Sequence, residues 1–70
     1  MTVKEFLYKL DVLGYYTCKI FSSNNNLIFE GSAEEFAFGK DPNLYEEIVE
    51  ISICSKSSNH DFEIITSSSK

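Results

Sequence analysis

The spacing of hydrophobic residues changes near residue 14, from a helical repeat to a strand repeat. Before that point, apolar residues stand at i, i+3, i+4, i+7 and i+10: Val3, Phe6, Leu7, Leu10 and Leu13. This spacing predicts a helix of about three turns with one apolar face. Thr2 and Glu5 have the spacing of a capping box, and Gly14 is suited to end a helix.

After residue 14, aromatic, β-branched and alternating residues predict four strands, over residues 15–21, 26–30, 49–53 and 62–66. Turn-forming residues at 22–25 join the first two strands into a hairpin, and a loop over 55–59 joins the last two. Between the hairpins, Ser32 and Glu35 have the spacing of a second capping box, and Gly39 suits the end of a short helix. Asp41 and Pro42 can start a further helical turn.

These elements predict an α+β fold. We expect a four-stranded antiparallel sheet made of two hairpins, covered on one face by the N-terminal helix, with the short helix between the hairpins. The residues expected to face that helix are Cys18, Ile20, Leu27, Phe29, Val49, Ile51, Ile53, Phe62 and Ile64. We expect one domain over residues 1–66 and a frayed tail over 67–70.

Charge and composition argue against several classes of protein. The 70-residue chain has a net charge of −5 at pH 7 and six basic residues, all lysine and scattered. It has no basic patch for a phosphate backbone, so direct nucleic-acid binding is not expected. No window approaches the roughly 18 apolar residues of a membrane span. Two cysteines 36 positions apart do not resemble a secreted disulfide framework, so we expect a cytoplasmic protein.

Acidic residues are concentrated between residues 30 and 50, where seven of them stand against one lysine. One interpretation is that they solvate a surface and complement a helix N-terminus. The other is that they resemble a phosphate backbone and direct the domain to a basic groove of another protein. Phe36 and Phe38 lie in the same segment, and at least one of them should be exposed. The predicted partner-binding residues are Glu30, Glu34, Glu35, Phe38, Asp41, Tyr45, Glu46, Glu47 and Glu50.

No constellation of residues indicates catalysis, and we expect no enzyme activity. Cys18 shares the parity of Ile20 and should be a small buried hydrophobe. Cys54, His60 and Asp61 can meet at one hairpin end, which is a weak zinc signal. Strand parity directs His60 toward the face of Phe62 and Cys54 outward, and a fourth ligand would have to come from Glu63, water or a second molecule. We therefore expect no metal and no cofactor, with His60 in an exposed loop.

Three segments resemble small acidic proteins encoded by phages and prophages of Gram-positive bacteria. They are Tyr15-Tyr16-Thr17-x-Lys19-Ile20, Asn26-Leu27-Ile28-Phe29-Glu30-Gly31 and Glu47-Ile48-Val49-Glu50-Ile51-Ser52-Ile53. Several such proteins are anti-CRISPR inhibitors of type II effector nucleases. The resemblance, which spans residues 2–66, implies a stoichiometric inhibitor in the host cytoplasm that binds the nuclease and prevents target DNA from binding. It carries over no catalytic residue.

Two other classes remain open. One is a phage accessory protein that binds a different host defence or replication protein. The other is a homodimeric structural module that uses its sheet edge.

Overall fold

The computed structural model describes residues 1–11, 13–54 and 59–69. In chain order the elements are the helix α1 (Val3–Leu7), the 3₁₀ helix η1 (Leu13–Tyr15), the strands β1 (Thr17–Phe21) and β2 (Leu27–Ser32), the helix α2 (Ala33–Ala37), the 3₁₀ helix η2 (Pro42–Tyr45), and the strands β3 (Ile48–Ile53) and β4 (Phe62–Thr66). The predicted α+β class is confirmed. No helix of the described chain is long and apolar enough to cross a membrane. The predicted loop over 55–59 lies outside the described residues except for Asn59.

The four strands form one mixed sheet in the order β2-β1-β4-β3. The pairs β1–β2 and β3–β4 are antiparallel, as predicted. At the centre, β1 and β4 run parallel, with Cys18 opposite Phe62 and Ile20 opposite Ile64, so the prediction of a purely antiparallel sheet was wrong. Short connections fix the direction of pairing within a hairpin, but the sequence contains no corresponding signal for how two hairpins meet.

Helix α1 is much shorter than the three predicted turns. Its capping box is present: the Glu5 N–H donates to Thr2 Oγ1 at 3.2 Å, and the Thr2 N–H donates to Glu5 Oε1 at 2.8 Å. The Tyr8 N–H still donates to the Lys4 carbonyl, four residues back, but the N–H groups of Lys9 and Leu10 donate to carbonyls three residues back, a tighter pattern that closes the helix. Gly14 therefore stands inside η1 instead of ending α1. The Leu13 side chain, predicted to end the apolar stripe, lies outside the described part of the chain.

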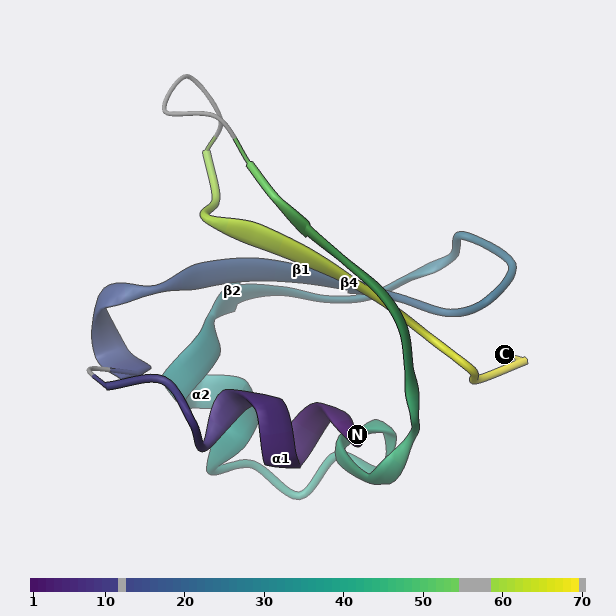
Figure 1. The fold of residues 1–70 in the computed structure, drawn as a ribbon, viewed down its shortest axis with the longest axis horizontal. Helices are drawn as coiled ribbons and strands as arrows, with labels where there is room; N and C mark the ends of the chain where they lie inside the picture. Colours follow the sequence, from purple (N-terminus) through teal and green to yellow (C-terminus); the bar gives the residue numbers. More distant parts are fainter. Residues whose placement is uncertain (12, 55–58, 70) are drawn as a thin grey trace.

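The hydrophobic core lies between the helices and the two central strands, and both helices lie on the same side of the sheet (Figure 1). Its buried members are Val3, Leu7, Cys18, Ile20, Ala33, Phe36, Ala37, Leu44, Phe62 and Ile64. Four of the predicted core residues are thereby confirmed. Phe29 is half-buried and packs its ring on Phe36, with the ring centroids 4.8 Å apart.

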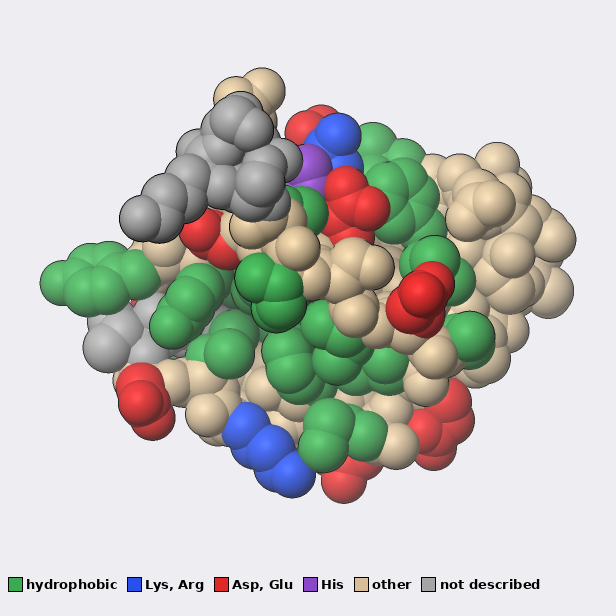
Figure 2. Space-filling model, turned by 45° about the horizontal axis from the view of Figure 1, so that its top comes forward, with side chains coloured by type: hydrophobic (Ala, Val, Ile, Leu, Met, Phe, Trp, Pro, Cys, Tyr) green, Lys and Arg blue, Asp and Glu red, His purple; other side chains and the backbone are tan. Residues whose placement is uncertain are grey.

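The edge strands are less buried than the sequence predicted. Leu27, Val49, Ile51 and Ile53 are exposed, Ile53 with 80% of its surface. The register places Ile51 opposite the buried Ile64 and Ile53 opposite the buried Phe62, so for these two the predicted face is right and the predicted burial is wrong. Leu27 pairs with Phe21 after a register shift, and Val49 lies at a second shift, so strand alternation does not place these two on the predicted face. The edge strands are less buried because the buried cluster takes its strand residues from β1 and β4 only. Hydrophobic side chains accordingly gather across the middle of one molecular face, with acidic side chains around them (Figure 2).

Residues 67–69, predicted as part of a frayed tail, are hydrogen-bonded to other parts of the fold: the Ser67 N–H donates to the Glu47 carbonyl at 2.9 Å, and Ser68 and Ser69 bond to the turn between β1 and β2. Ser68 is buried, and its carbonyl accepts from both the backbone N–H and the hydroxyl of Ser23, each at 2.8 Å. The Asn24 amide donates to the Ser69 carbonyl at 3.1 Å. The chain therefore remains hydrogen-bonded to the rest of the fold beyond the end of β4. Residue 70 lies outside the described residues.

Candidate functional site

Three exposed aromatic rings meet on the helical side of the molecule. Tyr8 follows α1, Phe38 follows α2, and Tyr45 ends η2, with 54%, 67% and 67% of their surfaces exposed. The rings of Tyr8 and Phe38 make an edge contact with centroids 6.0 Å apart. Lys4 Nζ lies 5.5 Å from the centre of the Tyr8 ring and 5.4 Å from that of Tyr45. We call Lys4, Tyr8, Phe38 and Tyr45 the aromatic face.

Local structure explains why these rings point outward. Phe36 is buried in the core and α2 ends at Ala37, so Phe38 lies beyond the helix and is exposed. This confirms the prediction that at least one of the two phenylalanines is exposed. The start of η2 is also as predicted: Asp41 Oδ1 accepts from the Asn43 N–H at 2.8 Å, and Pro42 is at the first helical position.

Four predicted binding carboxylates belong to segments that adjoin the aromatic face. Glu34 and Glu35 are exposed in the first turn of α2. Glu46 and Glu47 follow directly after η2. The second capping box was wrong, since the Ser32 side chain makes no cap hydrogen bond to α2. Glu47 Oε2 accepts a hydrogen bond from the Met1 amine at 2.8 Å, and this bond raises the pKa of the amine.

The remaining candidates lie apart from this group or have a structural role. Glu30 is in β2, where it pairs with Lys19 at 3.6 Å on the sheet face opposite the core. Glu50 is in β3, at the other edge of the sheet. Asp41 is half-buried and caps η2. The structure therefore separates the acidic segment into a helical group and two edge residues.

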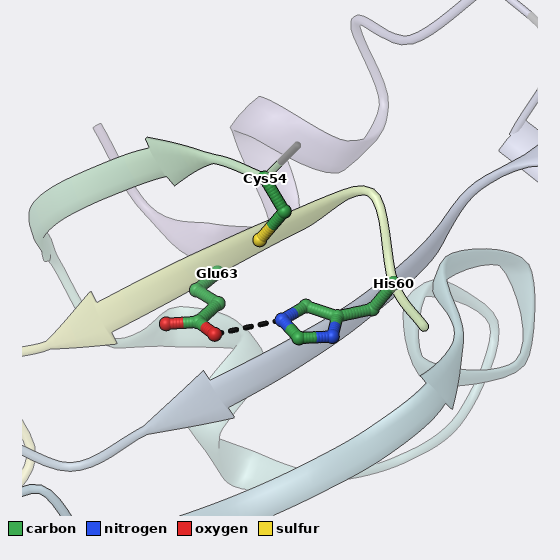
Figure 3. A group of neighbouring side chains, drawn as sticks. All are labelled: Cys54, His60 and Glu63. Atoms are coloured by element: carbon green, nitrogen blue, oxygen red, sulfur yellow. Dashed lines mark hydrogen bonds and ion pairs between the residues drawn. The ribbon is translucent and has the colours of Figure 1, made fainter. Parts of the chain in front are cut away.

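A second cluster of reactive side chains, the Cys–His–Glu cluster, lies where β3 ends and β4 begins (Figure 3). It consists of Cys54, His60 and Glu63, each of which offers an atom within 4.8 Å of the others. His60 Nε2 donates to Glu63 Oε2 at 2.7 Å. The Cys54 N–H donates to the Asp61 carbonyl at 2.9 Å, which continues the β3–β4 ladder to the position of the thiol.

The predicted placement of His60, on the face of Phe62 and away from Cys54, was wrong. Asp61 causes the difference. Its Oδ2 accepts from the Thr17 N–H and its own N–H donates to the Thr17 carbonyl, both at 2.8 Å. These bonds fix the chain just before β4 starts, so strand alternation does not extend back to residue 60. Asp61 thus bonds to β1, and Glu63 occupies the position in the cluster that was predicted for Asp61.

His60 is also more buried than an exposed loop residue, since 11% of its side chain is accessible. Among the described residues, its Nδ1 is buried and has no hydrogen-bond partner. The sequence signal that could have identified the cluster is the parity of Glu63. It stands between the core residues Phe62 and Ile64 and must face the other side of the sheet, as Cys54 does.

The electrostatic setting of Cys54 does not favour a nucleophile. Partial burial, and then the charges of Glu63 and Asp61, raise the pKa of the Cys54 thiol. Reactive catalytic cysteines need the opposite shift, because the thiolate is the attacking species. The thiol, imidazole and carboxylate are suited instead to bind a cation. The positive charge of a bound cation would favour the thiolate and so offset the raised pKa of the thiol.

The described residues enclose no pocket for a small substrate. The rings of the aromatic face are exposed, and the side chains of the Cys–His–Glu cluster are half-buried. Comparison of the chain with protein-family models, with curated protein sequences and with solved structures found no match.

Proposed function

We propose that this protein acts by binding another protein through the aromatic face. The observation that carries the proposal is that three exposed rings lie together at the ends of α1, α2 and η2, with Tyr8 against Phe38 and Lys4 over both Tyr8 and Tyr45. Aromatic side chains bury about 150–250 Å² each when fully covered, and they are common anchors of protein interfaces. A partner with apolar pockets would cover these rings, and a basic rim would complement Glu34, Glu35 and Glu46.

We further propose that the partner is a type II CRISPR effector nuclease and that the protein is its stoichiometric inhibitor in the host cytoplasm. The choice of target follows from the resemblance to phage-encoded inhibitors. It is supported by the acidic residues in the segments that carry the aromatic face, α2 and the residues after η2, since such nucleases hold nucleic acid in positively charged channels. Carboxylates placed in a DNA channel exclude the phosphate backbone, so inhibition requires binding and no catalytic residue.

The test is a mobility-shift assay with guide-loaded nuclease and target DNA. One equivalent of the protein should abolish DNA binding. A double variant, Phe38→Ala with Tyr45→Ala, should weaken inhibition on the order of 100-fold, because two interface anchors are lost. The matched control is Tyr15→Ala, which removes a ring that is 82% exposed and lies outside the aromatic face. Its inhibition should equal that of the wild type.

A second pair of variants tests the acidic residues. Glu34→Lys with Glu35→Lys should slow association and reduce its dependence on salt, whereas Glu30→Lys should change association little. Unchanged DNA binding across type II nucleases would reject the nuclease as target. Inhibition that survives both the ring and the charge variants would reject the aromatic face. A mass of the protein alone that rises with concentration would instead support the homodimeric alternative.

A further inference from the structure

We propose that Cys54, His60 and Glu63 form a binding site for a zinc ion. The site lies on the sheet face opposite the core, because Glu63 alternates with the buried Phe62 and Ile64. The aromatic face belongs to the helical side. The zinc proposal is therefore independent of the proposed function, and either can fail without the other.

The ligand types select the metal. A thiolate and an imidazole suit zinc and disfavour magnesium, calcium and manganese, which prefer oxygen ligands. Carboxylate oxygen completes many zinc sites. The three residues supply one ligand of each type, and all come from the segment that joins β3 to β4 and from β4 itself.

The distances are close to those of a tetrahedral site. With bonds of about 2.0 Å to nitrogen and oxygen and about 2.3 Å to sulfur, ligand atoms lie about 3.3–3.6 Å apart. The three ligand atoms here all lie within 4.8 Å of one another, and the Nε2–Oε2 pair is at 2.7 Å. Movements of about an ångström would therefore place them around one ion. The ion would occupy the place of the proton that now joins Nε2 to Oε2.

The backbone already holds the ligands in place. Residue 54 is fixed by its N–H bond to the Asp61 carbonyl, and residue 61 is fixed by its bonds to Thr17. Glu63 is inside β4. Three protein ligands leave the fourth position to water or to a group from another molecule. A metal here would join the end of β3 to the start of β4, which stabilises a domain with a small core.

The first experiment is a cobalt titration of the full chain under reducing conditions. Cobalt(II) replaces zinc and reports its ligands, through a thiolate-to-cobalt charge-transfer band in the near ultraviolet and visible bands of tetrahedral intensity. We expect saturation at one equivalent and displacement by zinc. Cys54→Ser should abolish the charge-transfer band, and His60→Asn and Glu63→Gln should each weaken cobalt binding about 10- to 100-fold or more.

Two variants serve as matched controls. Cys18→Ala removes the other thiol, and Glu50→Gln removes an exposed carboxylate of β3. Both should retain the wild-type cobalt spectrum. The proposal is overturned if no saturable band appears in the wild type, if the band persists in Cys54→Ser, or if the controls lose it equally.

A second measurement uses the wild type alone, so that a variant that fails to fold does not decide the matter. One equivalent of zinc should slow alkylation of Cys54 at least tenfold and raise the thermal midpoint. With free zinc a hundredfold above the dissociation constant, the rise should be on the order of 10 °C. Unchanged alkylation and an unchanged midpoint with zinc would also overturn the proposal.

Discussion

The two cysteines show how place in the fold sets the chemistry of a residue. Cys18 is fully buried in the central strand β1, and burial, followed by the charge of Asp61, raises the pKa of its thiol to about 11. Cys54 is half-buried at the end of β3. Both thiols are free. The prediction of a buried Cys18 was made from strand parity and is confirmed.

We expect alkylation to separate the two thiols. At pH 8 a thiol with a pKa near 11 is about 0.1% thiolate, and the thiolate is the reactive form. Iodoacetamide should therefore modify Cys54 in the native protein and leave Cys18 unmodified until the chain is denatured. Peptide mass spectrometry measures both sites in one sample. Native labelling of Cys18 at the rate of Cys54 would contradict the buried position of Cys18.

At the scale of single elements, local sequence signals succeeded where side chains bond to nearby backbone. The capping box of α1 and the Asp41 cap of η2 are present as predicted. The length of α1 could not be predicted, since the apolar stripe continues past Leu7 while the backbone changes to tighter turns. The rest of the apolar stripe still packs against the core, because Phe6 inside α1 and Leu10 beyond the end of α1 are both half-buried against it.

Removing the α1 cap should destabilise the domain. Thr2→Ala should lower the free energy of unfolding by about 1 kcal/mol, as expected for loss of an N-cap. Ser32→Ala is the control, because Ser32 is an N-cap whose side chain makes no cap bond, and its effect should be a few tenths of a kcal/mol at most. Urea denaturation measures both. Equal losses would show that the Thr2 bonds contribute nothing specific.

The same cap predicts a dependence on pH. Hydrogen bonds from Thr2, backbone first, lower the pKa of Glu5 below its ordinary value of 4.5. A pKa that is lower in the folded state contributes stability above 4.5, and this stability is lost as pH falls through the folded-state value. Glu5→Gln should therefore lose less stability than the wild type between pH 7 and acid pH. Parallel curves for the two proteins would contradict the role of Glu5.

At the scale of the whole molecule, the arrangement of strands was the part that sequence did not determine. The pairing within both hairpins was predicted, and period-2 alternation gives the sheet face of strand residues except around the register shifts near Leu27 and Val49. The parallel β1–β4 contact and the exposure of β3 depend on how the hairpins meet. The same is true of the Cys–His–Glu cluster, since His60 reaches Cys54 only because Asp61 bonds to Thr17 of β1.

The difference in burial between β4 and β3 can be measured with two isoleucines, both of which were predicted from the sequence to lie in the core. Ile64→Ala should cost about 2–5 kcal/mol, because Ile64 is fully buried between the central strand and the helices. Ile53→Ala should change stability by no more than about 0.5 kcal/mol, because the side chain is 80% exposed. Chemical denaturation gives both values. Similar losses at the two positions would show that β3 is covered in solution.

The parallel pairing of β1 with β4 also bears on how the chain folds. Partners such as Cys18 and Phe62 are 44 positions apart, so the centre of the sheet forms only after a long loop has closed. During synthesis, β1 has no central neighbour until residues 62–66 are made, and the hairpin of β1 and β2 must wait with its apolar face open. Two-stranded hairpins are marginal in water by themselves. The slow step of folding is therefore expected to be the meeting of the two hairpins, with rates typical of proteins rich in long-range contacts.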